Sequence, residues 1–285
     1  MPWTVEKTGP TVATLRIEAK RGASWEQRIL LSADRHLDNP LSNQALQARH
    51  LKEAVAFDAP VIDCGDLFDA MQGKNDRRSC KSALKEENKK AAYLNSLVET
   101  STSFFTPFAK QLAVIGKGNH ESAILKHAEF DLTSYLIKEL RHAGSPAVMG
   151  GYRGWVRIML TSGTTCQSFN LYYTHGSGTN AVVTKGIIST NRRASFVDAD
   201  VIVGGHIHES WSLDMCRVGL TAQGAERVND QLHLCIPTYK EEFTDLADGF
   251  HHEKEGPPKP IGAWWLIITY DIEQGRFRLN SMRAK

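Results

Sequence analysis

Residues 61–69 of the chain read VIDCGDLFD, and in this stretch an apolar run gives way to a polar loop. Its first part belongs to residues 60–63, a short run of the kind that forms a buried strand. Two carboxylates, Asp66 and Asp69, follow at once. Open α/β sheets bind their ligands at the carboxyl ends of strands, so we expect this loop to contribute to a ligand site.

Other polar clusters in the chain also stand directly behind strand-like runs. In chain order the five clusters are Asp34-Arg35-His36, Gly65-Asp66-Leu67-Phe68-Asp69, Gly118-Asn119-His120-Glu121, His175-Gly176 and Gly204-Gly205-His206-Ile207-His208. Taken alone, a D-x-H or H-x-H pair is usually coincidence, and a G-D-x-x-D stretch is more often a turn. The complete ordered set is what indicates one shared site.

The side chains of these clusters favour a transition-metal site. Asp offers a hard oxygen, His a borderline nitrogen and Asn a neutral carbonyl, which together suit Mn, Fe, Zn, Ni or Co better than Ca or Mg. On an extended segment, residues i and i+2 point to the same side. If these segments are extended, Asp34 and His36 reach one metal together, and His206 and His208 do the same from another segment.

The apolar pattern predicts alternating strands and helices in the first half of the chain and mainly strands in the second half. The expected strands are residues 28–32, 60–63, 112–115, 155–160, 169–173, 201–203, 213–220, 231–236, 263–270 and 276–282. The expected helices are 41–57 with Ser42 or Asn43 as its cap, 81–108 as one or two helices, and 130–143, while 181–193 is a helix or a loop. The pattern predicts an α/β fold in which helices flank a sheet sandwich, as one domain over residues 1–285.

Composition narrows the class of protein without naming a partner. The chain has 285 residues, 41% of them hydrophobic, which is enough for a large core and argues against global disorder. A net charge of +2 neither requires nor excludes nucleic acid. The five cysteines are scattered without a C-x-x-C motif, which favours free thiols in a reducing compartment. The sequence shows no signal-peptide order and no bilayer-length apolar run, so we expect a cytoplasmic protein without a membrane partner.

The order of the polar clusters resembles that of the calcineurin-like metallophosphoesterases, whose pattern is D-x-H, G-D-x-x-D, G-N-H-[DE], H and G-H-x-H. Every position of this pattern is present between residues 34 and 208. The resemblance implies a four-layer α/β/β/α sandwich with a mixed two-sheet core. It also implies phosphoester hydrolysis by a hydroxide shared between two divalent ions, with Mn expected first and Fe, Zn, Ni or Co as alternatives. Residues 65–81 also resemble phosphoesterases of tailed phages, which indicates no substrate.

The resemblance assigns a role to each residue of the pattern. The expected ligands are Asp34, His36 and His208 for the first metal, Asn119, His175 and His206 for the second, and Asp66 as the bridge between them. His120 is expected beside the leaving oxygen, as a general acid or a charge stabiliser. Asp69 and Glu121 are expected to orient His120 or a ligand histidine, with helix capping or a surface ion pair as the alternative.

Basic residues near the pattern bear on the substrate. Lys74, Arg77 and Arg78 follow the Asp66 motif and are candidates for contacts with a nucleic-acid or nucleotide phosphate, unless they simply form a solvated loop. The other basic positions are Lys185 with Arg192-Arg193, which either line the cleft or solubilise a loop, and Arg35, which is expected to point away from its neighbours as a packing or ion-pair partner.

The function expected first is that of a phosphodiesterase, nuclease-like in its chemistry, acting on nucleic acid or on cyclic or other nucleotides. A phosphomonoesterase, including a protein phosphatase, is the alternative, because enzymes of that kind add arginines beside the metals. A non-catalytic scaffold is a third possibility, against which the intact ligand set and His120 argue. The sequence indicates no protein partner.

Overall fold

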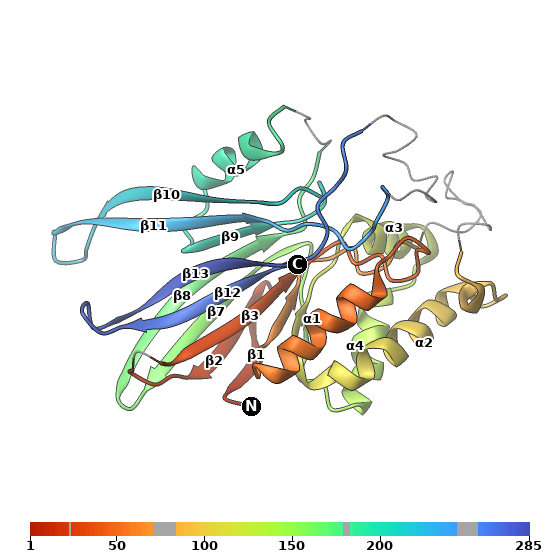
Figure 1. Ribbon diagram of the computed structural model, residues 1–285, viewed down its shortest axis with the longest axis horizontal. Helices are drawn as coiled ribbons and strands as arrows, with labels where there is room; N and C mark the ends of the chain where they lie inside the picture. Colours follow the sequence, from red (N-terminus) through yellow and green to blue (C-terminus); the bar gives the residue numbers. More distant parts are fainter. Residues whose placement is uncertain (23, 71–83, 179–182, 244–255) are drawn as a thin grey trace.

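Two β-sheets pack face to face, and helical segments cover the outer face of each, which gives four layers (Figure 1). The computed structural model describes residues 1–22, 24–70, 84–178, 183–243 and 256–285. Both sheets mix parallel and antiparallel neighbours. The four-layer α/β/β/α sandwich expected from the sequence is therefore confirmed.

The six-stranded sheet supplies the first three ligand motifs. Its order is β13-β12-β3-β4-β5-β6. The strands are β3 (Glu26–Ser32), β4 (Val61–Asp63), β5 (Leu112–Ile115), β6 (Val148–Met149), β12 (Ala263–Asp271) and β13 (Arg276–Ala284). Because β3, β4 and β5 are parallel neighbours, their carboxyl ends meet at one edge of the sheet.

The seven-stranded sheet supplies the last two motifs. Its order is β1-β2-β7-β8-β9-β11-β10. The strands are β1 (Trp3–Gly9), β2 (Val12–Glu18), β7 (Arg153–Ser162), β8 (Thr165–Thr174), β9 (Val201–Gly204), β10 (Trp211–Leu220) and β11 (Glu226–Cys235). Strands β8 and β9 are parallel neighbours, so the residues that follow them also lie side by side.

The helices connect the strands and cover the sheets. They are α1 (Gln44–Ala56), α2 (Tyr93–Phe105), α3 (Asn119–Ala128), α4 (Leu132–His142) and α5 (Ile187–Ala194), with 3-10 turns η2 (Glu86–Asn88) and η3 (Thr106–Gln111). Asn43 caps α1, since its side-chain oxygen accepts a hydrogen bond of 2.9 Å from the amide of Leu46. Within the described residues, no helix combines the length and the apolar character that a membrane span needs.

Successive side chains along a strand point to opposite faces of the sheet, and this alternation determines which residues enter the hydrophobic core. In β9, Val201 and Val203 point into the large core between the two sheets, while Ile202 joins a smaller cluster on the outer face. A second large core lies between the six-stranded sheet and α1, α2 and α4 (Figure 1). Residues 263–268, part of the strand predicted over 263–270, belong to β12, which pairs with β3 and β13.

Among the described residues, the expected elements miss strands β1, β2 and β6 and helix α3, and residues 84–92 form η2 and turns rather than the start of a helix. The hairpin β1–β2 is missing from the prediction, because β1 is mostly exposed and carries little apolar signal. Helix α3 is also missing, since it begins inside a ligand motif at Asn119 rather than behind a capping sequence. Of the range 181–193, left open as a helix or a loop, residues 183–186 form a turn and residues from 187 belong to the helix 187–194.

Candidate metal centre

The seven predicted ligands lie close together, where loops that follow the carboxyl ends of strands in both sheets meet. The six-stranded sheet brings Asp34 and His36 after β3, Asp66 after β4 and Asn119 after β5, and the seven-stranded sheet brings His175 after β8 and His206 and His208 after β9. Among the described residues, three groups of side chains have donor atoms within 4.8 Å of one another: Asp34 with His36 and His208, Asp66 with His175 and His206, and His36 with Asp69 and His120. The first two, the ligand groups, consist of predicted ligands only. Each ligand group can hold one cation.

The first group is arranged around Asp34, which is fully buried. Its Oδ1 atom lies 3.3 Å from Nε2 of His208, and its Oδ2 atom accepts a hydrogen bond of 2.9 Å from the amide of His206. Both ring nitrogens of His36 are buried without a hydrogen-bond partner among the described residues, and Nε2 is the one that lies away from Asp69. Since an unpaired polar atom is costly to bury, this nitrogen fits a metal ligand.

The second group is arranged around His175. Its Nε2 atom lies 3.0 Å from Oδ2 of Asp66 and 3.1 Å from Oδ1 of Asn119. On the other side of the ring, Nδ1 lies 3.2 Å from the carbonyl oxygen of Cys64. A proton on Nδ1 donates to this carbonyl, which leaves Nε2 as the nitrogen that faces the site.

The ligand loops are not extended as expected. Asp34 and His36 still share one donor group, as predicted, whereas His206 and His208 belong to different groups, so the expectation that this pair reaches one metal together is wrong. Five ligands have positive φ: Asp34 51°, His36 45°, Asp66 51°, His206 73° and His208 55°. Left-handed residues turn the chain locally, so the intervening residue faces the opposite way within a compact loop. The loops are held by backbone hydrogen bonds, such as the 2.9 Å bond from the amide of Asp34 to the carbonyl of residue 65. Such conformations cost about 1–3 kcal/mol each and occur where surrounding structure enforces them.

Glycines allow the ligand loops to approach each other closely. A Cβ atom at Gly118 would lie 2.0 Å from Oδ1 of Asp66, and one at Gly205 would lie 2.8 Å from Oδ2 of Asp34. Both distances are shorter than a nonbonded contact allows. These two motif glycines are therefore required by the position of the carboxylates.

Asp69 lies behind His36, outside the two ligand groups. Its Oδ1 atom is 3.0 Å from Nδ1 of His36, and its Oδ2 atom accepts a hydrogen bond of 2.7 Å from Asn39. Burial opposes the ionisation of Asp69, but the contact with His36 and the charge of Lys240, 3.8 Å away, hold its pKa below the usual range. An ionised Asp69 keeps the His36 proton on Nδ1, so that Nε2 faces the site.

Glu121 has a different role from the one expected. Its carboxylate accepts hydrogen bonds from the amides of Gly118 at 2.7 Å, Asp66 at 3.1 Å and Phe68 at 2.9 Å. It thus caps the first turn of α3 and holds the Asp66 loop through the backbone, rather than orienting a histidine. Of the two alternatives stated for this residue, helix capping matches the contacts.

His120 lies beside the carboxylate of Asp66, the expected bridging ligand. Its Nε2 atom is 3.7 Å from Oδ2 of Asp66, and its amide donates to Oδ1 of the same residue at 3.0 Å. The Nδ1 atom contacts the carbonyl oxygen of Asp69. With Nδ1 bound to a carbonyl, Nε2 is free to face a substrate at the edge of the site.

The charges of the site fit divalent cations. Burial opposes ionisation of Asp34 and Asp66, but neighbouring histidines outweigh it and hold the pKa of each carboxyl below its usual range. Burial likewise disfavours the imidazolium of His175, but Asp66 and Asp34 raise its pKa to about 9. A position where buried carboxylates attract a proton this strongly is also one where they would hold a cation.

The basic residues divide into three groups. Arg35 is fully buried, with its Nε atom 2.6 Å from Oδ2 of Asp63, so it is an ion-pair partner that points away from the site. Lys74, Arg77 and Arg78 lie outside the described residues. The remaining ones are Lys185 and Arg192 in or next to α5, and Arg193, which lines a small cavity behind the His206 loop.

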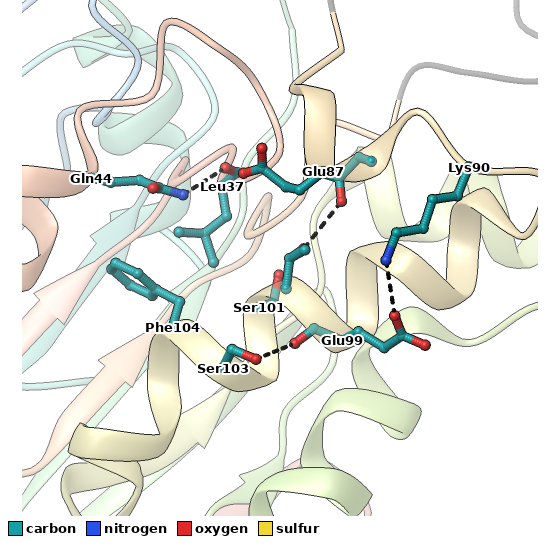
Figure 2. A pocket seen from close by; sticks show the side chains of 10 residues that line it. Leu37, Gln44, Glu87, Lys90, Glu99, Ser101, Ser103 and Phe104 are labelled. Atoms are coloured by element: carbon teal, nitrogen blue, oxygen red, sulfur yellow. Dashed lines mark hydrogen bonds and ion pairs between the residues drawn. The ribbon is translucent and has the colours of Figure 1, made fainter.

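A larger pocket of about 450 Å³ lies apart from the metal centre (Figure 2). It is lined by Leu37, Gln44, Glu87, Asn88, Lys90, Glu99, Thr100, Ser101, Ser103 and Phe104. No predicted ligand is among these residues, and several hydrogen-bond within the wall, as Gln44 does to the carbonyl of Leu37 at 3.2 Å. The pocket is therefore not the place of the predicted chemistry.

Sequence reasoning missed the residues that support Asp69. The Asp38 carboxylate accepts the amides of Asp69 at 2.6 Å and Ala70 at 2.8 Å, and Asn39 binds the Asp69 side chain. The position of Asp38 and Asn39, two and three residues after His36, was the available signal. Lys240 comes from a distant segment, and nothing in the sequence marks it.

The comparisons with known proteins concern the fold. No family model matches the chain, and no curated protein matches it. Among solved structures, a metallophosphoesterase from Sphaerobacter thermophilus is 15% identical, with 91% of this chain and 88% of that one covered and a TM-score of 0.37. Vps29 from Chaetomium thermophilum is 9% identical, with 90% and 95% covered and a TM-score of 0.36. GAP50, the anchor in the inner membrane complex of Plasmodium, is 11% identical, with 91% and 85% covered and a TM-score of 0.40.

With identities and TM-scores this low, these likenesses carry no argument about the activity of the chain. The order of its motifs and the convergence of their side chains are properties of the chain itself. In its layered fold, motif order and arrangement of donor groups, the chain resembles the calcineurin-like metallophosphoesterases.

Proposed function

We propose that the chain is a metal-dependent phosphoesterase whose substrates are phosphodiesters, in nucleic acid or in cyclic or other nucleotides. The observation that supports this most is the pair of donor groups, Asp34 with His36 and His208, and Asp66 with His175 and His206. We further propose Mn as the ion used first, because mixed oxygen and nitrogen donors suit it, with Fe, Zn, Ni or Co as alternatives.

Different residues of the site have different roles in the proposed reaction. Two divalent ions, when bound, would supply a hydroxide near neutral pH and neutralise phosphate oxygens. His120 presents Nε2 at the edge of the site, where it can donate a proton to the leaving oxygen or stabilise its charge. Asp69 holds the proton of His36 on the ring nitrogen that faces away from the site.

The charges near the site favour a diester over a monoester. A monoester carries a second negative charge, which phosphatases balance with additional cations. Among the described residues, no arginine contacts the donor groups: Arg35 is paired with Asp63, and Lys240 lies 2.8 Å from Glu242. A phosphomonoesterase is the second candidate function.

The test is hydrolysis by the Mn-loaded protein of bis-p-nitrophenyl phosphate, p-nitrophenyl phosphate, cyclic nucleotides, and single- and double-stranded DNA. Asp66→Asn is the test variant, and Asp214→Asn, an exposed position on β10, is the matched control. We expect diester cleavage in the wild type and in Asp214→Asn. Asp66→Asn should lose both bound Mn and turnover, because Asp66 belongs to the His175 group and is the proposed bridge to the other ion.

Each result separates the candidates. Turnover of the monoester alone would replace the diesterase with a phosphatase. Normal Mn content in Asp66→Asn, measured by atomic emission, would contradict the bridging role. Full Mn occupancy without turnover of any ester would favour a binding protein instead of an enzyme.

A further inference from the structure

A small cavity lies directly behind the loops that carry His175 and His206. Its volume is about 60 Å³, which exceeds the roughly 10–15 Å³ needed for one water molecule. The lining residues are Gly176, Ser177, Gly178, Gly186, Ser189, Arg193, Gly204, Gly205, Ile207, Trp211, Leu234 and Cys235. Arg193 is the one ionised side chain in this wall at neutral pH.

Arg193 is a half-buried cation without a counter-ion in the described part of the chain. Its Nη2 atom donates to the hydroxyl of Thr190 at 2.9 Å, and its Nε atom is buried without any hydrogen-bond partner. No ion pair joins it to a carboxylate within the described residues. Burial without such a partner lowers the pKa of its guanidinium. A guanidinium in this state can bind an anion through charge-assisted hydrogen bonds.

The other walls of the cavity leave room for a small polar ligand. Five of the lining residues are glycines, and a Cβ atom at Gly204 would lie 3.3 Å from Nη2 of Arg193. A side chain there would press against the guanidinium. Ser177 and Ser189, two exposed serines, are also among the lining residues, and serine hydroxyls are donors that suit an oxyanion.

The cavity is connected to the metal centre through shared backbone. Gly176 directly follows His175, and Gly205 and Ile207 stand on either side of His206. The Nε2 atom of His206 lies 3.2 Å from the carbonyl oxygen of Gly178, a lining residue. A ligand in the cavity therefore lies next to the second donor group.

We propose that the Arg193 cavity binds a phosphate group that is not the one being hydrolysed. The ligand class is a tetrahedral oxyanion, which comes either from a second phosphate of the substrate or from free inorganic phosphate. The possibility that the phosphate belongs to the substrate rests on the proposed function. The binding of free phosphate does not.

Calorimetric titration of inorganic phosphate into the Mn-loaded protein tests the binding itself. The variants are Arg193→Gln, Arg193→Lys and Arg192→Gln, the last being an exposed arginine on the same helix and a charge-matched control. Phosphate binding at the metals is common to all of them. We expect a second binding component in the wild type and in Arg192→Gln, weakened in Arg193→Lys and lost in Arg193→Gln. Equal isotherms for Arg193→Gln and Arg192→Gln would overturn the proposal, provided both melt at the wild-type temperature.

Kinetics then distinguish the two sources of phosphate. The substrates are the dinucleotide TpT and its 5′-phosphorylated form pTpT. If the cavity takes a substrate phosphate, Arg193→Gln raises KM for pTpT by about 10- to 100-fold, the factor expected for a hydrogen bond to a charged group, and leaves KM for TpT unchanged. Unchanged KM for both, with the phosphate component lost, assigns the cavity to free phosphate. Because the titration needs no turnover, an inactive protein would refute the proposed function without refuting the anion site.

Discussion

At the residue scale, the centre depends on side chains held by strained backbone. Five of the seven predicted ligands have left-handed φ values, which L-residues adopt at a cost. The contacts around them repay this cost: Asp34 alone receives hydrogen bonds at its backbone carbonyl from Thr238 and Tyr239, at 2.9 and 3.0 Å. Rigid donor groups of this kind lose little entropy when an ion binds.

The role of His120 gives a residue-scale prediction. His120→Ala should keep its bound Mn, because His120 belongs to neither predicted ligand set, but lower turnover by about 10²–10⁴-fold if it acts as a general acid. The loss should shrink for esters with good leaving groups, which need no proton. His127→Ala, at an exposed position of the same helix, should behave as wild type. An equal loss across leaving groups would assign charge stabilisation instead.

A second residue-scale prediction concerns pH. Burial lowers the pKa of His50 to about 4, where its Nδ1 atom lies 2.9 Å from the hydroxyl of Tyr239. The unfolded chain binds a proton near pH 6.5, so the stabilising effect of neutral His50 is complete above that pH and falls as pH drops toward 4. One proton corresponds to a slope of about 1.4 kcal/mol per pH unit.

His50→Gln should therefore flatten the decline in the free energy of unfolding between pH 6.5 and 4.5, as measured by urea denaturation. His142→Gln, at an exposed position, should keep the wild-type slope. Parallel curves for His50→Gln and the wild type would rule out this titration. Loss of metal at low pH affects all three proteins alike and cancels in the comparison.

At the element scale, the ends of parallel strands bring the ligands together, and this is the part that the sequence predicted well. Residues 112–115 and the clusters behind each apolar run stand out because buried strands are continuous apolar segments. The turns between each strand and its ligand could not be predicted from the sequence. Their φ values depend on contacts such as those made by Glu121 and Asp69, and the residues that make these contacts lie far apart in the chain. Lys240 shows the same limit, since only the tertiary fold brings it to Asp69.

The cap of α1 gives an element-scale prediction. Asn43→Ala removes the hydrogen bond to the amide of Leu46 and should lower the free energy of unfolding by about 1 kcal/mol. Asn43→Asp retains a capping oxygen and should lose less. Urea denaturation with an unchanged m-value measures both. Equal stability of Asn43→Ala and the wild type would mean that the contact contributes nothing.

At the scale of the whole molecule, the predicted ligands belong to both sheets. Asp34, Asp66 and Asn119 follow strands of one sheet, and His175 and His206 follow strands of the other. Ions bound there would connect the two layers of the sandwich on the edge of their shared core. The fold and the ligand set therefore stabilise each other.

Metal removal tests this connection. A chelator should lower the melting temperature measured by scanning calorimetry, and added Mn should restore it. An ion present at 1,000 times its Kd stabilises the native state by about 4 kcal/mol. Asp66→Asn should melt at nearly the same temperature with and without chelator. A wild-type melting temperature that the chelator leaves unchanged would show that no ion contributes to stability.

The placement of the predicted ligands on two sheets also affects the rates of folding and unfolding. The donor groups assemble only after segments from Asp34 to His208 have been brought together, which we expect late in folding because contacts between distant segments carry the larger loop-closure cost. Contacts made after the transition state slow unfolding and leave the folding rate almost unchanged. Bound ions would thus lengthen the lifetime of the native chain rather than hasten its formation, and a protein that has lost them would open, and become accessible to proteases, far more often.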